Sequence, residues 1–196
     1  MVTVVWAGGG AASEIHTFRL VEEDVPSGPG AKFSSSTDIR NSDISLNILD
    51  PIGRPFSLPP PPGPAAATPA DSSGSGRVLP PLGWVTPHPS GRALYVADRT
   101  NWPGMAASTG CVRAVLLEPA TGLPLAELGS PQCSEGLGPC HLSVSEHFVL
   151  VSNYAGGTVA VLPILPGREL GAAVCVRRHR TDGAGLHARQ DQAHTT

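Results

Sequence analysis

The sequence has little charge, and it lacks the patterns of several large protein classes. Only 15% of its 196 residues are charged and the net charge is −3, so it offers no basic face for a nucleic acid. The one dense basic run, residues 177–180 (RRHR), is short enough to be a solvated strand end. No apolar run reaches the roughly 18 residues that a membrane-spanning helix needs. We therefore expect neither a nucleic-acid partner nor a membrane partner.

The four cysteines show no CxxC pair and no zinc spacing, and three of them lie next to valine or in apolar runs, as small buried hydrophobes do. Residues 1–6 (MVTVVW) are apolar, but no basic region precedes them and residues 7–10 (AGGG) follow. This pattern predicts a strand and a turn rather than a signal peptide. It also differs from a glycine-rich phosphate loop, because the glycines lead into a second strand and not into a helix. We expect a cytoplasmic protein with reduced thiols.

Glycine and proline are abundant instead, with 23 and 21 residues, and both disfavour helix interiors. Short apolar strands bounded by turn residues are therefore expected, with no helices between them, which argues against a parallel α/β sheet. Runs of proline, serine, glycine and alanine dominate residues 25–81, and such a composition predicts a disordered insertion. The one strand predicted inside it covers residues 44–49 and ends at Asp50-Pro51.

Strand signals after this region repeat with a period of about 50 residues. Residues 94–98 (LYVAD) correspond to residues 149–153 (VLVSN), and residues 110–112 (GCV) correspond to residues 157–159 (GTV). Repeats of this size with four strands each are typical of propeller blades. The sequence thus predicts an all-β, partial β-propeller of about two and a half to three four-stranded antiparallel blades, with the long Pro/Ser/Gly/Ala-rich insertion. The expected boundaries are a first partial blade at 1–24, the insertion at 25–81, further blades at 82–130 and 136–178, and an inter-blade loop with the start of another blade at 179–196.

Three further stretches form a recognisable set: residues 87–97 (PHPSGRALYVA), residues 138–144 (GPCHLSV) with 152–159 (SNYAGGTV), and residues 189–194 (RQDQAH). They resemble motifs of the seven-bladed propeller lactonases, which include the propeller type of 6-phosphogluconolactonase and the fungal muconate lactonizing enzymes. The last stretch departs from the family pattern, because Asp191 replaces a glutamate, Ala193 replaces a proline and Thr196 stands at the second histidine position. The resemblance covers a little under three blades of the seven.

The resemblance implies hydrolysis of a sugar-acid lactone, 6-phosphogluconolactone to 6-phosphogluconate, with no cofactor. Opening a lactone needs an activated water and a partner for the oxyanion. His141 is the candidate base, since histidine ordinarily titrates near neutrality, and Arg189 is the candidate anion-holding group. Gln190 and His194 are candidates for binding the substrate. A histidine at a strand start is also a common hydrogen-bonded structural residue, and this reading stays open for His141.

Two further alternatives stay open. A metal site would need His141, His187 and His194, but no compact ligand motif or paired carboxylates accompany them, so no metal is expected. The chain could instead be a catalytically inactive propeller fragment or truncated product that acts as an interaction module. Fewer than three blades leave open strand edges, which predicts self-association and an inactive 196-residue chain.

Overall fold

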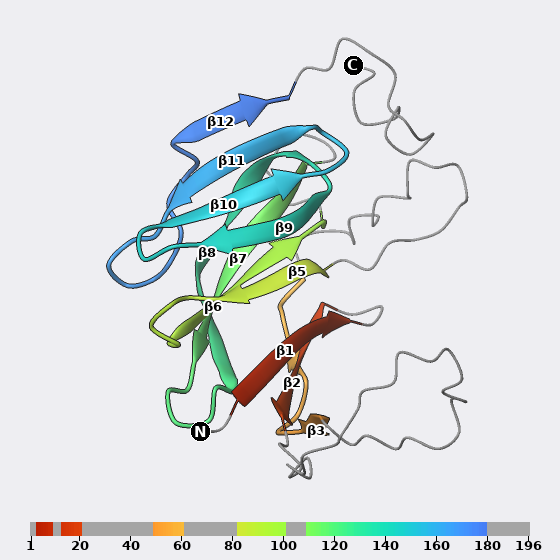
Figure 1. Cartoon of the computed structure of the whole chain (residues 1–196), viewed down its shortest axis with the longest axis vertical. Helices are drawn as coiled ribbons and strands as arrows, with labels where there is room; N and C mark the ends of the chain where they lie inside the picture. Colours follow the sequence, from red (N-terminus) through yellow and green to blue (C-terminus); the bar gives the residue numbers. More distant parts are fainter. Residues whose placement is uncertain (1–2, 10–12, 21–48, 61–81, 101–108, 180–196) are drawn as a thin grey trace, which may run out of the picture.

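The computed structural model describes residues 3–9, 13–20, 49–60, 82–100 and 109–179, and these contain strands and turns but no α-helix (Figure 1). The strands form three four-stranded antiparallel sheets. The all-β, partial-propeller prediction is therefore confirmed. The disorder predicted for most of the insertion concerns residues 25–48 and 61–81, which lie outside the described residues. Among the residues that are described, no helix is long and apolar enough to cross a membrane.

The first sheet is built around β2 (Glu14–Leu20), which pairs on one side with β1 (Thr3–Gly9). Its other side pairs with two short strands, β3 (Leu49–Pro51) and β4 (Phe56–Ser57). Both short strands lie inside the range that the sequence assigned to the insertion. Pro51 does not follow the strand as predicted but is its last paired residue, opposite Phe18. Proline is tolerated there because β3 is an edge strand.

The second and third sheets repeat one plan, in which each strand pairs with the next along the chain. In the second sheet Asp98 lies opposite Cys111, and in the third Asn153 lies opposite Thr158, so the predicted repeat is reproduced in the strand register. The strands of the second sheet are β5 (Leu82–Pro87), β6 (Ala93–Asp98), β7 (Thr109–Leu117) and β8 (Pro124–Leu137). Those of the third are β9 (Pro139–Val144), β10 (Phe148–Asn153), β11 (Thr158–Pro163) and β12 (Cys175–Arg178).

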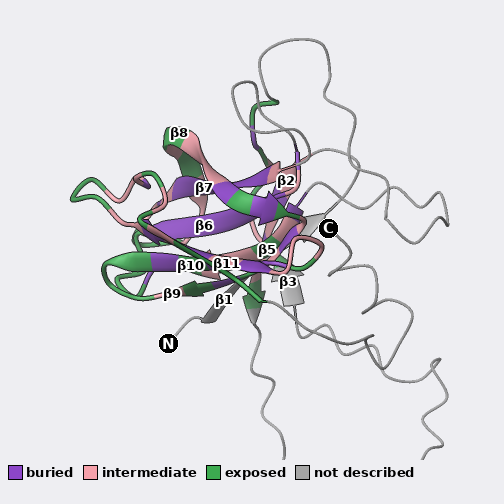
Figure 2. Cartoon of the chain, turned by 90° about the horizontal axis from the view of Figure 1, so that it is seen from above, coloured by how far each residue is buried: buried purple, intermediate pink, exposed green. Residues whose placement is uncertain are grey.

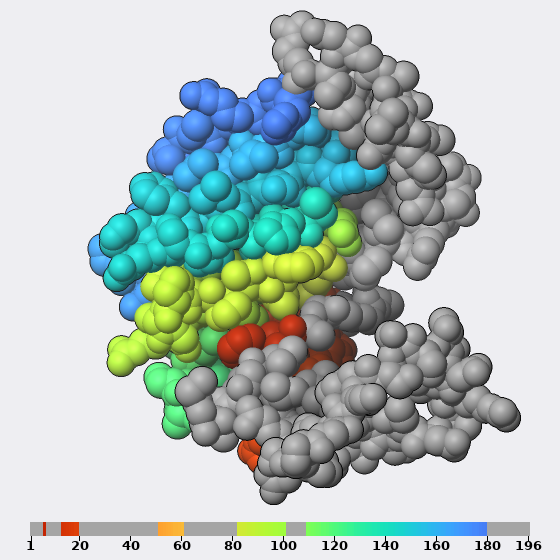
Figure 3. All heavy atoms as spheres, in the orientation of Figure 1, coloured from red at the N-terminus to blue at the C-terminus, as the bar shows by residue number. Residues whose placement is uncertain are grey.

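The three sheets stack in chain order, and their first strands β1, β5 and β9 lie beside one another (Figure 1). The second sheet is covered on both faces, and every residue of β6 is buried (Figure 2). The core shared with the third sheet contains Ala93, Tyr95 and Ala97 of β6. The core shared with the first sheet contains Leu94 and Val96. The space-filling view shows the second and third sheets as one continuous packed surface (Figure 3).

The histidine–proline–serine–glycine turn between β5 and β6 is a structural contact between sheets. The backbone N–H of Ser90 donates to Nδ1 of His88 at 3.0 Å, and Nε2 of His88 lies 3.2 Å from the Glu146 carbonyl oxygen of the next sheet. The His88 side chain is buried. The turn residues of the first family-like stretch therefore have a structural role, since they connect the second sheet to the third.

The chain crosses from the second to the third sheet at Gly138, whose φ of 64° lies in the left-handed region that favours glycine. The end of β8 passes over the β10–β11 turn and is held there by Asn153. The Asn153 amide nitrogen donates to the Ser134 carbonyl oxygen at 2.7 Å and to Thr158 Oγ1 at 3.0 Å. This crossing sets where β9 begins, and so it fixes the start of the strand that carries His141.

Candidate functional site

His141 is an exposed residue on β9, the first strand of the third sheet. It lies directly opposite Ser152 of β10, while the neighbouring Leu142 and Val151 fill the core shared with the second sheet. Because successive side chains of a strand point to opposite faces, the His141 side chain does not enter that core and is exposed. Within the described part of the chain, no hydrogen bond to the ring is found. The imidazole is thus available to a ligand at the edge of the sheet.

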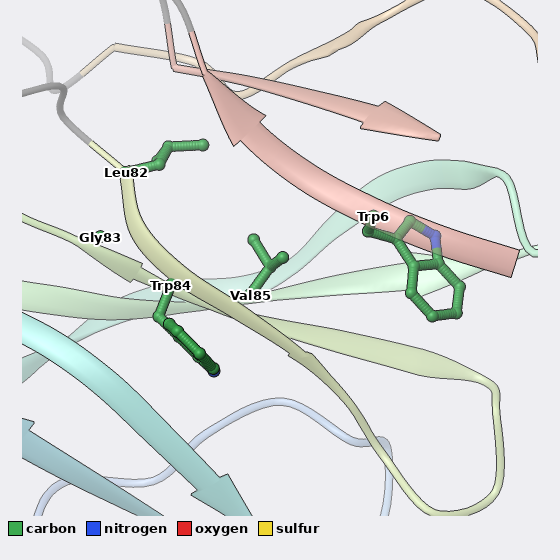
Figure 4. Close-up of a pocket in the computed structure, with 5 residues that line it drawn as sticks. All are labelled: Trp6, Leu82, Gly83, Trp84 and Val85. Carbon is green, nitrogen blue, oxygen red and sulfur yellow. The ribbon is translucent and has the colours of Figure 1, made fainter. Parts of the chain in front are cut away.

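Trp84 of β5 lies against this ring, with the two ring centroids 4.7 Å apart and the planes inclined by 47°. Trp84 and Val85 leave β5 on opposite sides, so the tryptophan faces the third sheet while Val85 packs toward the first (Figure 4). The Trp84 side chain is 45% exposed, which is high for a residue of this size beside a core. One face of the site is therefore an accessible aromatic ring.

The orientation of Trp84 is fixed by a short chain of hydrogen bonds. Its Nε1–H donates to Thr86 Oγ1 at 2.8 Å, and the Thr86 hydroxyl donates to the Leu142 carbonyl oxygen at 3.3 Å. The second bond joins β5 to β9 beside His141. The aromatic ring is thus held in position by the strand that carries the histidine.

A guanidinium group lies at the same end of these two strands. A Cβ atom added to Gly83 would lie 3.1 Å from Nη2 of Arg99 and closer still to the Pro139 carbonyl oxygen, so only glycine fits there. The pairing register shifts between Leu82 and Trp84, which marks a β-bulge at Gly83. Burial lowers the pKa of the half-buried Arg99, but an arginine side chain keeps its charge at physiological pH. We call Trp84 and His141 the inner-edge site, and the Arg99 guanidinium lies against Gly83, the residue before Trp84.

An open cavity of about 270 Å³ lies along the first strands, next to the inner-edge site. It is lined by Trp6, Leu82, Gly83, Trp84 and Val85 (Figure 4). Its volume is close to the lower limit for small-molecule sites, which are mostly apolar with a few placed polar groups. The cavity and the exposed ring together can receive a small ligand that has both an apolar face and polar substituents.

Residues 74–195 match the family described as Lactonase, 7-bladed beta-propeller. The chain belongs to this family of seven-bladed β-propeller lactonases. A 66-residue stretch is 39% identical to a 6-phosphogluconolactonase of Bacillus subtilis (strain 168), covering 33% of this chain and 18% of that relative.

Solved structures resemble the lactonase-family chain in fold. A candidate 6-phosphogluconolactonase from Bacteroides fragilis matches with a TM-score of 0.57 and 19% identity, over 96% of this chain and 39% of its own. A periplasmic gluconolactonase from Pseudomonas aeruginosa matches with a TM-score of 0.58 and 17% identity, over 97% and 41%. The chain therefore spans about two fifths of these structures and a smaller part of the Bacillus relative.

Four site residues were predicted for this lactonase-family chain, and the structure describes one of them, His141. His141 is on the first strand of its sheet, as described above. Arg189, Gln190 and His194 lie outside the described residues, so their approach to His141 stays a prediction. Two of the three histidines of the metal alternative, His187 and His194, also lie outside the described residues. Within the described ranges, no group of three side chains that could ligate a metal is found.

Sequence reasoning missed Trp84 and Arg99. In the sequence, Trp84 resembles a core residue of a strand. Arg99 comes directly after the strand at residues 93–98 and resembles an ordinary charged residue of a loop. The only local signal is Gly83, since a glycine inside a strand often marks a bulge or a close backbone approach. The two strands β5 and β9 belong to different sheets but lie side by side, and this contact brings Trp84 to His141. A contact between sheets has no pattern in the sequence.

Within the described residues of this lactonase-family chain, a buried charge cluster lies apart from Trp84 and His141. Arg113 donates from Nε to Glu127 Oε1 at 2.6 Å and from Nη1 to Asp98 Oδ2 at 3.1 Å. Burial opposes the charge of Arg113, but its hydrogen bonds and attraction to Glu127 and Asp98 outweigh that and raise its pKa. Arg113 thus holds both carboxylates on the second sheet, and its Nη2 donates to the Pro59 carbonyl oxygen at 2.9 Å, which is a structural role.

Proposed function

We propose that this protein hydrolyses a sugar-acid lactone, and specifically 6-phosphogluconolactone to 6-phosphogluconate. The observation that carries the proposal is the exposed His141 beside the Trp84 ring, on the first strand of a sheet in a lactonase-family chain. The name of the Bacillus relative supports the choice of lactone.

In the proposed reaction, His141 accepts a proton from a water molecule as the water oxygen attacks the lactone carbonyl carbon. The carbonyl oxygen becomes an oxyanion, which needs a positive or hydrogen-bonding partner, and Arg189 is the proposed group. The ring C–O bond then breaks, the ring oxygen takes a proton and leaves as a hydroxyl, and the product is the open-chain acid. Gln190 and His194 are proposed to bind the sugar hydroxyl groups. No cofactor is proposed, because the acyl group passes from the ring oxygen to water without a change of oxidation state.

The test is the hydrolysis of 6-phosphogluconolactone by the purified 196-residue chain, followed by acid release against the spontaneous rate. His141→Ala and Arg189→Ala should each lower the enzymatic rate roughly 100-fold or more, as removal of an acid–base or charge-stabilising group generally does. His147→Ala is the matched control, because His147 is exposed in the turn after β9 and is not part of the site. Full activity in His141→Ala would contradict the proposal. So would a folded, monomeric wild-type chain that hydrolyses the lactone no faster than the spontaneous rate.

A second candidate is an inactive interaction module that associates with itself. Phe148 and Leu150 are 42% and 40% exposed and share the face of the third sheet that turns away from the second. Adjacent exposed apolar side chains of this kind favour association. Sedimentation of the chain at several concentrations tests it: the Phe148→Ser and Leu150→Ser variants should be more monomeric than the wild type. A monomeric wild type would remove this candidate.

The proposed compartment is the cytosol. All four cysteines are described and none is in a disulfide, which is the usual state in a reducing compartment. Fractionation of cells that produce the protein would test this assignment, and recovery in a secreted fraction would contradict it.

A further inference from the structure

We infer that Cys111 and Cys133 form an oxidation site, in which a peroxide converts the two thiols into a disulfide between β7 and β8. The structure shows the reduced form, since all four cysteines are described and none is in a disulfide. In a reducing compartment such a bridge is transient and responds to oxidants. The site shares no residue with the proposed hydrolysis.

The two cysteines are neighbours through strand pairing. Cys111 of β7 lies directly opposite Cys133 of β8 in the antiparallel register. Directly opposite residues have Cα atoms about 4.5 or 5.5 Å apart, and their side chains lie on the same face of the sheet. Both separations fall within the roughly 4.4–6.8 Å that a disulfide spans. By contrast, Cys175 lies opposite Val161, so no such partner faces it.

The strand pairing is irregular on both sides of this cysteine pair. The register shifts between Thr109 and Cys111, and it shifts again between Val112 and Ala114. Formation of a disulfide brings the Cβ atoms of an opposite pair closer by about 1 Å. Because bulges bend a strand locally, β8 can make this movement beside the pair without displacing the ladder further along.

The two thiols differ in their access to an oxidant. Cys111 is fully buried, and this burial, followed by the charge of Asp98, raises the pKa of its thiol. Cys133 is partly exposed. A dissolved peroxide therefore reaches Cys133 first, and Cys111 reacts only with a group that is already inside the fold.

The groups around Cys133 Sγ suit an attacking sulfur atom. The backbone N–H of Glu135 donates to Sγ at 3.4 Å, and the Cys133 thiol donates to Thr109 Oγ1 at 3.7 Å. Glu135 makes its contact with a φ of 57°, a left-handed conformation that residues other than glycine seldom adopt. This strained turn points a hydrogen-bond donor at the sulfur, where negative charge is present during the attack.

The proposed oxidation has two steps. Cys133 Sγ attacks one oxygen of hydrogen peroxide, the O–O bond breaks, and the products are a Cys133 sulfenic acid and water. Cys111 Sγ then attacks Cys133 Sγ, the S–O bond breaks, and the hydroxyl leaves as water with the thiol proton of Cys111. Two thiols are oxidised to one disulfide, and one peroxide is reduced to two water molecules. The strand register holds the sulfur atoms side by side, which offsets the poor reactivity of a buried thiol.

The experiment treats the reduced full chain with hydrogen peroxide, blocks the remaining thiols with N-ethylmaleimide in denaturant, and maps the peptides by mass spectrometry. Cleavage after arginine and glutamate places the four cysteines on separate peptides, because such residues lie between each of them. A linked pair of Cys111 and Cys133 peptides should be the main oxidised product, with Cys140 and Cys175 blocked. The double variant Cys140→Ser, Cys175→Ser is the matched control, and it should form the bridge as the wild type does.

Variants of the two cysteines separate the two steps. Cys111→Ala should stop the reaction at the sulfenic acid, so that dimedone labels Cys133 roughly tenfold more than in the wild type, where the neighbouring thiol consumes the intermediate. Cys133→Ser should leave Cys111 as an unmodified thiol, since the buried residue does not meet the peroxide. Cys111→Ser replaces Cys111→Ala if circular dichroism shows that the alanine variant is unfolded.

The proposed site is wrong if the folded chain keeps Cys111 as a thiol while Cys133 is oxidised further. It is also wrong if another cysteine pair is the main bridge, or if peroxide modifies neither residue. Bridges between chains, which a non-reducing gel reveals, would contradict it as the main product. Peroxide treatment in urea should spread the oxidation over all four cysteines, because the selectivity comes from the strand register of the folded chain.

Discussion

Asp98 and Asn153 occupy the same position in two successive sheets, but one carries a charge and the other does not. Each ends the second strand of its sheet and is buried, and the residues opposite them are Cys111 and Thr158. Asp98 accepts a hydrogen bond from Arg113, whereas the position equivalent to Arg113 in the third sheet is Ala160. The carboxylate is therefore present in the sheet that has a buried cation, and the amide in the sheet that lacks one.

Replacing Arg113 by methionine should lower the free energy of unfolding by about 3–5 kcal/mol, because Asp98 and Glu127 would remain buried without their cation. Chemical denaturation followed by fluorescence measures the change. Arg92→Met, at an exposed position, should change stability by less than about 0.5 kcal/mol. The triple variant with Asp98→Asn and Glu127→Gln should recover part of the loss. A loss below about 1 kcal/mol in Arg113→Met would show that the three groups are not coupled.

Asn153→Asp should destabilise the protein at pH 7 by roughly 3 kcal/mol, since it buries a carboxylate without a cation and removes the amide donor to Ser134. Burial raises the pKa of such a carboxyl group, so the native variant binds a proton more readily than the unfolded chain does. The stability lost should therefore be smaller at pH 4 than at pH 7.

Denaturation of wild type and Asn153→Asp at the two pH values gives the comparison. Asp98→Asn is the reciprocal variant, and it should be destabilised at pH 7 because Arg113 loses one of its two carboxylates. Equal losses at both pH values for Asn153→Asp would contradict the burial of the new charge.

The Tyr95 hydroxyl should make the protein less stable at alkaline pH. Its side chain is fully buried, its hydroxyl donates to the Arg168 carbonyl oxygen at 3.1 Å, and burial raises its pKa to about 12. Between about pH 10 and that value the unfolded tyrosine loses its proton while the native one keeps it, so stability falls as pH rises. Tyr95→Phe should cost about 1 kcal/mol at pH 7 but show a shallower decline above pH 10.

Thermal unfolding of wild type and Tyr95→Phe from pH 8 to pH 11.5 measures this difference. Parallel curves for the two proteins across that range would mean that Tyr95 ionises equally in the native and unfolded states.

Cys111 should resist alkylation in the native protein. Its thiol is fully buried, and burial together with the neighbouring Asp98 carboxylate raises its pKa well above the ordinary value. Only the thiolate reacts, so native labelling at pH 8 should modify the partly exposed Cys133, Cys140 and Cys175 before Cys111. Peptide mapping by mass spectrometry gives the order, and labelling in denaturant provides the control. Early modification of Cys111 would contradict its burial.

The repeated sheets could be predicted because the signals are local. Short apolar strands, glycine and proline turns, and two pairs of matching segments predict the four-stranded repeat, and those segments lie in β6, β7, β10 and β11. They also place His141 on the first strand of its sheet. The β3 and β4 strands could not be predicted, because two or three residues show no readable alternation and their partner β2 is far along the chain.

The groups around His141 could not be predicted for a different reason. Trp84 reaches the histidine only because β5 and β9 lie side by side, and the Arg99 guanidinium fits against β5 only because Gly83 has no side chain. Likewise, the sequence does not show that Arg113 meets Glu127, since a bulged register between β7 and β8 decides which residues face each other. Contacts that depend on packing between sheets have no period along the chain.

The burial of β6 on both faces separates odd from even positions. Ala93, Tyr95 and Ala97 belong to one core, and Leu94 and Val96 belong to the other. A substitution at an odd position therefore alters the fit to the third sheet and spares the first, and an even position does the reverse. Two neighbouring interfaces can in this way diverge independently through a single six-residue strand, while the loss of that strand would open both at once.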